Sequence, residues 1–310
     1  MVLAGKSKQA RQKQRAGIRL RDYTITEKTK RRYESAVARI LPFLEKQPSL
    51  QDLDGVVTDW IELEWTRGES VGWIADALSG LHFYMPELKG LLRQSWRMFR
   101  SWRRIEAPQR APPMTAWIAR AVVSRAIQLE DLQFGALICL GFHCLLRTGE
   151  LLSLQYQDIE FTDTCGIVSL HSSKSGLRTG TEEAVAIRDR LVLDVLRTLF
   201  QLHYQYPGQK LWTGSAQSFR DNFARYIRFF RICHLKMKPY SLRRGGATYL
   251  LQEGVSLDVI LLRGRWKSLG VARLYLEDGL AQIPQLRIGA GDKSRISSFA
   301  DKCSSTAFRP

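Results

Sequence analysis

The sequence predicts a mainly α-helical protein with a small antiparallel β-sheet, divided into two domains. Apolar residues recur at helical spacing through most of the 310 residues, and only CGIVSL and EEAVAI have the short, alternating character of strands. The polar segment APQRAPPM, residues 107–114, contains three prolines, which is typical of a linker. These observations place the domain boundary near residue 110.

The first 22 residues are predicted to form a flexible basic arm. Seven lysines and arginines precede the first acidic residue, Asp22. Such an arm can lie along phosphates. A mitochondrial transit peptide is the competing interpretation, which the presence of a single serine weakens.

Residues 23–108 are predicted to form a helical domain. Its segment LKGLLRQSWRMFRSWRRIE interleaves arginines with Trp96, Phe99 and Trp102. Two interpretations stay open: the arginines follow a phosphate backbone, or the aromatic residues belong to the core and the arginines to a solvated face. The arginines concerned are Arg93, Arg97, Arg100, Arg103 and Arg104.

Residues 115–285 are predicted to form the second domain. It opens with helices in TAWIARAVVSRAI and LEDLQFGALICLGFHCLLR, of which the second is almost continuously apolar. The two strands then flank SSKSGLRTG, which predicts a hairpin. Helices resume and continue to about Tyr275. Residues 286–310 are predicted to be a C-terminal tail, and because the segment is poorly periodic, a well-formed helix exchanged with a neighbouring protomer is not expected.

The charge of the chain favours a polyanionic partner. The formal net charge is +17 at pH 7, and nucleic acid is the commonest polyanion inside cells. The alternative is a basic surface that only keeps the protein in solution. The five cysteines and five histidines show no metal-ligand spacing, so neither a metal nor another cofactor is expected.

No membrane partner is expected either. The longest apolar runs fall short of the roughly 20 residues that span a bilayer, and the first residues lack the apolar core of a secretion signal. We therefore expect an intracellular protein, located in the nucleus of a eukaryote or in the cytoplasm, at the nucleoid, of a bacterium.

Several arginines and a lysine are candidates for holding an anion. Arg147 ends an apolar helix, and a buried guanidinium needs an anionic partner, either Glu150 or a substrate phosphate. Arg243 and Arg244 stand beside two glycines at the start of a helix, a place where anions bind. Lys174 lies at the turn of the hairpin, where a lysine alone is a weak signal.

In order and spacing these residues match one pattern. LLRTGELLSLQYQDI, SSKSG, YSLRRGGATYLLQEGVSLDVI and GRW, followed nine residues later by Tyr275, resemble the motifs of tyrosine recombinases of the phage integrase family. Within this family the sequence resembles the recombinases of DIRS-like and Crypton-like mobile elements, so a mobile element is expected to encode it. The resemblance covers about residues 115–280, and the preceding helical region is similar in size and placement to the family's core-binding domain.

The resemblance implies a site-specific recombinase or integrase that breaks and rejoins double-stranded DNA without a cofactor, as a homotetramer on two DNA sites. It implies a 3′-phosphotyrosyl intermediate, with Tyr275 as nucleophile, Lys174 as acid, and Arg147 and Arg243 on the phosphate. Trp266 either donates its indole N–H to the phosphate or is a core residue. The implied catalytic residues are Arg147, Lys174, Tyr240, Arg243, Trp266 and Tyr275, with Glu150 in support. The expected DNA-binding residues are Arg93, Arg97, Arg100, Arg103 and Arg244, and for Arg244 a salt bridge is the alternative.

One residue departs from the family pattern. The histidine of the HxxR motif is replaced by Tyr240, which donates a hydrogen bond but titrates near pH 10. Loss of acid–base help would slow the reaction by about 10² to 10⁴-fold. A catalytically impaired DNA-binding relic therefore stays an alternative, as does an enzyme similar to type IB topoisomerases.

Overall fold

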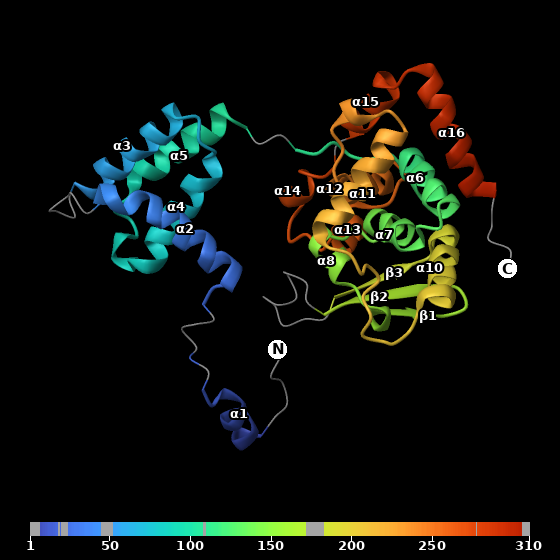
Figure 1. Ribbon diagram of the computed structural model, residues 1–310, viewed down its shortest axis with the longest axis horizontal. Helices are drawn as coiled ribbons and strands as arrows, with labels where there is room; N and C mark the ends of the chain where they lie inside the picture. The colour runs from blue at the N-terminus through green and yellow to red at the C-terminus, as the bar shows by residue number, and fades with distance from the viewer. Residues whose placement is uncertain are drawn as a thin grey trace. The chain divides into compact units, whose positions relative to one another are not determined.

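The structure is a computed structural model, and it describes residues 7–17, 19, 24–44, 52–107, 110–171, 183–276 and 278–305. The chain divides into two compact units, Met1–Gln109 and Arg110–Pro310 (Figure 1). Within the described ranges no helix is long and apolar enough to cross a membrane.

The first unit consists of helices around one apolar core. Trp60, Ile74 and Leu78 are fully buried at its centre. The helical spacing of apolar residues places these side chains on the inner faces of the helices, and their burial drives folding. The elements are α1 (Lys8–Arg15), α2 (Glu27–Leu44), α3 (Leu53–Thr66), α4 (Val71–Tyr84), η2 (Pro86–Leu88) and α5 (Arg93–Ile105).

The N-terminus of α5 is capped from another helix. The carboxylate of Asp54, on α3, accepts hydrogen bonds from the backbone N–H groups of Gln94 and Ser95 at 2.8 and 3.0 Å. Burial acts to raise the pKa of Asp54, but these hydrogen bonds and that of the Ser95 hydroxyl outweigh it, so the pKa is lowered. The cap fixes the start of α5 and therefore the direction in which its arginines point.

The second unit builds a helical bundle beside a three-stranded sheet. The strands pair antiparallel in the order β1-β2-β3, with Val168 of β2 opposite both Ile159 and Val185. Two of these strands were predicted; β1, with three residues, is too short to give a period-two signal. The strands are β1 (Ile159–Phe161), β2 (Gly166–Leu170) and β3 (Glu183–Ile187).

The helices of the second unit enclose its core. The almost wholly apolar α7 lies at the centre and contacts α6, α10 and α12 (Figure 1). The helices are α6 (Ala116–Gln128), α7 (Leu132–His143), α8 (Thr148–Ser153), α10 (Arg190–His203), α11 (Ala216–Phe229), α12 (Tyr240–Gln252), α13 (Leu257–Gly264), α14 (Leu269–Ala272), α15 (Asp278–Arg287) and α16 (Ala290–Ser305), with 3₁₀ turns η3 (Tyr156–Asp158) and η4 (Cys233–Leu235).

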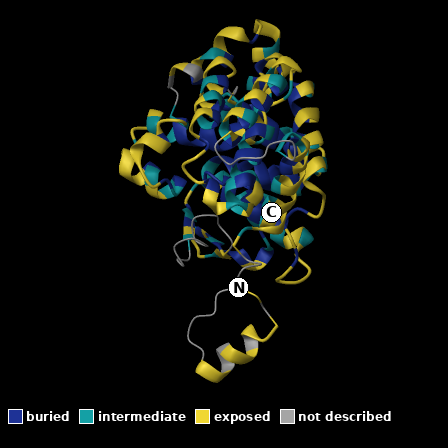
Figure 2. Cartoon of the chain, turned by 90° about the vertical axis from the view of Figure 1, so that its left-hand side faces the viewer, coloured by how far each residue is buried: buried dark blue, intermediate teal, exposed yellow. Residues whose placement is uncertain are grey.

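Both ends of the chain contain more helix than the sequence predicted. Part of the basic arm forms α1, whose described side chains are exposed (Figure 2). The predicted tail forms α16, which packs along α6 of its own chain. Ile296 of α16 is fully buried and the indole of Trp117 donates to Ser297 at 3.2 Å. The poor periodicity of this segment did not reveal the helix, because a few buried contacts rather than a regular apolar pattern hold it.

Candidate active site

Arg147 and Glu150 meet at the N-terminus of α8. Glu150 accepts hydrogen bonds from the backbone N–H of Arg147 at 2.8 Å and from its guanidinium at 2.5 Å. The Glu150 side chain is 7% exposed, whereas that of Arg147 is 32% exposed. Of the two partners that the sequence left open for Arg147, Glu150 is therefore present, and the guanidinium still reaches solvent.

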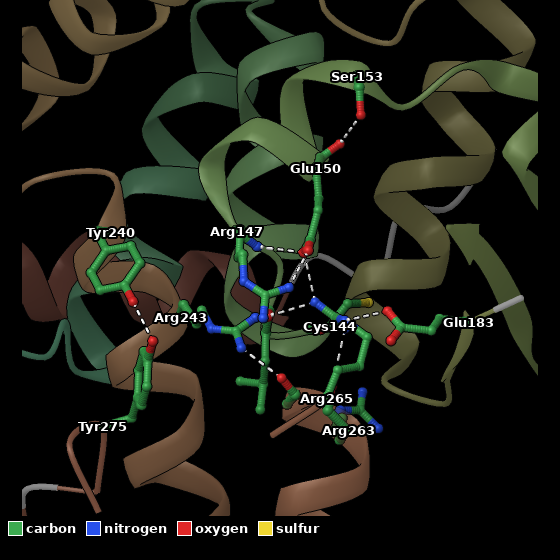
Figure 3. Close-up of polar contacts among 12 residues, drawn as sticks. Cys144, Arg147, Glu150, Ser153, Glu183, Tyr240, Arg243, Arg263, Arg265 and Tyr275 are labelled. Carbon is green, nitrogen blue, oxygen red and sulfur yellow. Dashed lines mark hydrogen bonds and ion pairs between the residues drawn. The ribbon is translucent and has the colours of Figure 1, made fainter. Parts of the chain in front are cut away.

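Arg265 completes this group, although the sequence analysis did not single it out. Its side chain is 5% exposed and forms ion pairs with Glu150 at 2.7 Å and Glu183 at 3.4 Å (Figure 3). Its backbone has a φ of +53°, in the region that favours glycine. Helix and strand periodicity do not predict such a conformation, so nothing in the sequence around Gly264 and Trp266 indicated the role of Arg265.

The carboxylate between two arginines stays ionised. Burial acts to raise the pKa of Glu150, but the charge of Arg265 and the hydrogen bonds of Arg147 outweigh it, so the pKa is lowered. Glu150 thus holds Arg147 from one side and Arg265 from the other. The arrangement orients a partly exposed guanidinium with a buried, negatively charged support.

Arg243 is buried completely beneath these groups. Its guanidinium donates to the carbonyl oxygens of Leu145 and Gly264, the latter at 2.5 Å, and its Nε has no hydrogen-bond partner among the described residues. Burial, together with the positive charges of Arg265 and Arg147, lowers the pKa of Arg243 to about 10. Arg243 remains a cation at neutral pH and joins the segment after α7 to the end of α13.

The two glycines beside Arg243 serve packing rather than anion binding. A Cβ on Gly245 would overlap the carbonyl group of Met114, and one on Gly246 would overlap that of Phe142. They let α12 approach these two backbone segments closely. The close approach that the sequence predicted at these glycines is therefore made by backbone carbonyl groups of the chain itself.

Tyr275 lies against Trp266 and Arg243. The rings of Tyr275 and Trp266 have centroids 4.6 Å apart, and the Arg243 guanidinium carbon lies 5.3 Å from the Tyr275 ring. Thr248 donates to the carbonyl oxygen of Tyr275 at 3.1 Å. Trp266 is 8% exposed and packs in an apolar cluster, and its buried Nε1 has no hydrogen-bond partner in the described part of the chain.

Tyr240 contacts Tyr275 directly. The Tyr240 hydroxyl donates to the Tyr275 hydroxyl at 2.5 Å (Figure 3). Burial and this hydrogen bond raise the pKa of Tyr240 to about 12. Burial acts to raise the pKa of Tyr275 as well, but the bond from Tyr240 and the charge of Arg243 outweigh it, so the pKa of Tyr275 is lowered.

The remaining predicted residues have different outcomes. Lys174 lies outside the described residues. Arg244 is 2% exposed, so its burial does not suit the DNA-backbone contact that the sequence predicted. On α5, Phe99 and Trp102 are buried in the core and the arginines are exposed. The aromatic residues therefore belong to the core, and contact of the arginines with DNA stays a prediction. Four of them, Arg97, Arg100, Arg103 and Arg104, line one open hollow.

Known proteins are similar in sequence to this chain. A family model described as the phage integrase family matches residues 120–279. The tyrosine recombinase XerD of Pseudomonas putida (strain KT2440) is 24% identical over 273 residues, which cover 84% of this chain and 90% of that protein. An integrase/recombinase xerD homolog of Selenomonas ruminantium is 28% identical over 177 residues, 49% of each chain.

Solved structures share the fold. The Tn1549 transposon integrase in complex with circular intermediate DNA matches with a TM-score of 0.57 and 14% identity, over 90% of this chain and 97% of that one. The XerH site-specific recombinase bound to palindromic difH substrate matches with a TM-score of 0.58 and 16% identity, over 82% and 79%.

Proposed function

This chain belongs to the phage integrase family of tyrosine recombinases, and on that premise we propose that it is a site-specific recombinase of a mobile element that uses Tyr275 as its nucleophile. The observation that carries the proposal is the position of Tyr275: its hydroxyl is bonded to Tyr240, and its ring centroid lies 5.3 Å from the Arg243 guanidinium carbon, in the same unit as Arg147. A transposon integrase among the structures of similar fold supports the mobile-element origin.

The chemistry follows from these groups. The Tyr275 oxygen attacks phosphorus and loses its proton to solvent, while the bond from phosphorus to the 5′ oxygen breaks and Lys174 protonates that oxygen. The positive charges of Arg147 and Arg243 stabilise the negative charge that develops on the non-bridging oxygens. The phosphotyrosyl link keeps the energy of the phosphodiester, so attack by a 5′ hydroxyl of another strand reverses the step.

The two arginines contribute differently. Arg147 reaches solvent and is oriented by Glu150, so it is ready to meet a phosphate. Arg243 is fully buried, so contact between its guanidinium and a phosphate requires the side chains around it, Trp266 and Tyr275 among them, to shift on DNA binding. Its unpaired Nε–H is the donor that a phosphate oxygen would satisfy.

DNA binding is assigned to the basic face of α5. No acidic partner within ion-pair distance is found for Arg97, Arg100 or Arg103 among the described residues, so the charges are available for phosphates. The net charge of +17 supports a long-range attraction to DNA. We propose a homotetramer on two DNA sites as the recombining assembly.

A suicide-substrate assay tests the proposed function. Nicked duplexes with a randomised sequence around the nick trap a covalent adduct, because the short strand carrying the 5′ hydroxyl diffuses away. We expect an adduct with the wild type and none with Tyr275→Phe. An adduct that persists in Tyr275→Phe would show that Tyr275 is not the nucleophile. No adduct on any duplex would favour the DNA-binding relic, an alternative that the replacement of histidine by Tyr240 supports.

The topoisomerase alternative has a separate readout. An enzyme of that class relaxes supercoiled plasmid of arbitrary sequence, whereas a site-specific recombinase acts only on DNA that contains its site. We expect no relaxation of plasmids that lack sequences recovered from the trapped adducts. Relaxation of every plasmid at similar rates would overturn the assignment as a site-specific enzyme.

A further inference from the structure

Tyr240 bonds to the nucleophile in this structure, at a position where the family pattern places a histidine. It is the first residue of α12, and its hydroxyl lies 2.5 Å from that of Tyr275, with ring centroids 5.9 Å apart and ring planes at 51° (Figure 3). Tyr240 is 37% exposed. Because water can reach a residue of that exposure, burial does not force its hydroxyl to bond with Tyr275.

Several groups restrain Tyr275, and Tyr240 is the one that donates a hydrogen bond to its hydroxyl at 2.5 Å. The carbonyl of Tyr275 is held by Thr248 and its ring by Trp266, so backbone and ring are restrained from two sides. Because the phenolic oxygen lies on the axis of the ring, these contacts set its place. The bond donated by Tyr240 then holds that oxygen and leaves the Tyr275 O–H proton directed away from Tyr240.

Tyr240 also differs from a histidine in what it does with its proton. Burial and the bond to Tyr275 raise the pKa of Tyr240 to about 12, whereas the pKa of Tyr275 lies below its ordinary value. At neutral pH Tyr240 therefore keeps its proton and cannot act as a base for the nucleophile. A donor that stays protonated stabilises the neighbouring oxygen as negative charge develops on it.

We propose that Tyr240 is a positioning residue for the nucleophile: its hydroxyl donates to the Tyr275 oxygen, holds that oxygen in place, and stabilises it as a phenolate during attack. The proposal rests on the proposed function of Tyr275. The proton balance is unchanged, since the Tyr275 proton leaves to solvent, the 5′ oxygen takes its proton from Lys174, and Tyr240 keeps its own. Tyr240 thus acts on the nucleophile rather than on a phosphate oxygen.

The free protein tests the contact without any DNA. Labelling the ten tyrosines with 3-fluorotyrosine gives fluorine resonances, and the Tyr275 signal is identified by its loss in Tyr275→Phe. In Tyr240→Phe we expect the titration midpoint of Tyr275 to rise by about 1 to 2 pH units, the equivalent of one hydrogen bond to a charged group. Tyr206→Phe, at an exposed loop position, is the matched control and leaves the midpoint in place.

Several groups besides Tyr240 affect the titration midpoint of Tyr275. They are Tyr240 and Arg243 of α12, Trp266 after α13, and Arg147 at the start of α8. The two arginines lower the midpoint in every variant, so they cancel in the comparison of wild type with Tyr240→Phe. An unchanged midpoint in Tyr240→Phe would overturn the proposal.

A cleavage assay separates positioning from phosphate contact. In nicked duplexes with a bridging sulfur at the 5′ position, the leaving group needs no proton, so the rate of adduct formation reports on the nucleophile. We expect Tyr240→Phe to slow adduct formation by about 10- to 100-fold at neutral pH. The rate of the variant should approach that of the wild type as the pH rises, because Tyr275 then ionises without help from Tyr240. Lys174→Ala, by contrast, is rescued by the sulfur at neutral pH.

Two outcomes of this assay would contradict the proposal. If Tyr240→Phe slows adduct formation by the same factor at every pH, Tyr240 contacts a phosphate oxygen instead of the nucleophile. If Tyr240→Phe cleaves faster than the wild type, the hydrogen bond restrains the nucleophile instead of assisting it. If the wild type forms no adduct on any duplex, the proposed function fails, and the titration in the free protein still decides whether Tyr240 sets the ionisation of Tyr275.

Discussion

Replacing Arg265 by methionine is expected to destabilise the second unit strongly. The substitution keeps a long apolar stem but leaves Glu150, whose side chain is 7% exposed, with a buried charge that only Arg147 offsets. Removing one partner of a buried ion pair costs about 3–5 kcal/mol. Because Arg265 also pairs with Glu183, we expect the upper part of that range.

A double-mutant cycle gives the magnitude of the coupling. Arg265→Met with Glu150→Gln lacks both charges, so its loss of stability is expected to be about 1–3 kcal/mol smaller than the sum of the single losses. Calorimetric or urea unfolding of the full chain measures these values, and the transition of the first unit serves as an internal reference since all substitutions lie in the second.

The acid side of the stability curve provides an independent check. The pKa of Glu150 is lowered in the folded chain, so its stabilising contribution is present at neutral pH and is lost as the pH falls through that folded pKa. The difference in stability between wild type and Arg265→Met therefore shrinks toward acid pH. A cost below about 1 kcal/mol at neutral pH, or a difference that does not depend on pH, would refute the role given to Arg265.

Three further outcomes are expected. Replacing Arg97, Arg100 and Arg103 together by glutamine makes the fall of log affinity for duplex DNA with log salt less steep, by about 1 for each phosphate that the variant no longer neutralises. The control Arg220→Gln on α11 leaves the slope unchanged. An unaltered slope in the triple variant would contradict the DNA-binding role of α5. Gly246→Ala forces a methyl group against the Phe142 carbonyl and costs about 1–3 kcal/mol or more, while Gly149→Ala, with open space around it, is tolerated; equal melting temperatures would contradict the packing. Ile296→Ala removes a fully buried side chain and costs about 2–5 kcal/mol, and Lys293→Ala serves as its exposed control; similar effects of the two would show that α16 is not docked.

Residues whose role depends on local pattern were predictable from the sequence. The helical core around α7 follows from its unbroken apolar run, and β2 and β3 follow from their short alternating segments. The order and spacing of the five short segments that contain Arg147, Lys174, Arg243, Trp266 and Tyr275 predicted the family. The assignment of these residues to catalysis stays a proposal, although the structure brings Arg147, Arg243, Trp266 and Tyr275 together within one unit.

Residues whose role depends on distant contacts were not predictable. Arg265 gains its importance from Glu150, which is 115 residues away in the sequence, and from a left-handed backbone that no periodicity reveals. The glycines of α12 looked like part of an anion site because their neighbours in sequence are arginines, but their neighbours in space are carbonyl groups. The helix α16 was missed for the same reason, because what stabilises it is α6, which lies far away in the sequence.

The origin as a mobile-element recombinase, and a kinship with DIRS-like or Crypton-like elements, stay proposals that the sequence of the DNA site would decide. The tetramer on two sites is a proposal of the same kind. Both depend on DNA that the chain recognises, and recognition is set by contacts to base edges and by DNA shape rather than by the catalytic residues.

The most direct measurement of the central claim is the identity of the residue that becomes covalently attached to DNA. Adducts trapped on nicked duplexes are digested with nuclease and protease, and the peptide that carries the remaining nucleotide is identified by mass spectrometry. We predict a nucleotide linked through its 3′ phosphate to Tyr275. Attachment to any other residue, Tyr240 included, or a 5′-linked nucleotide would contradict the account.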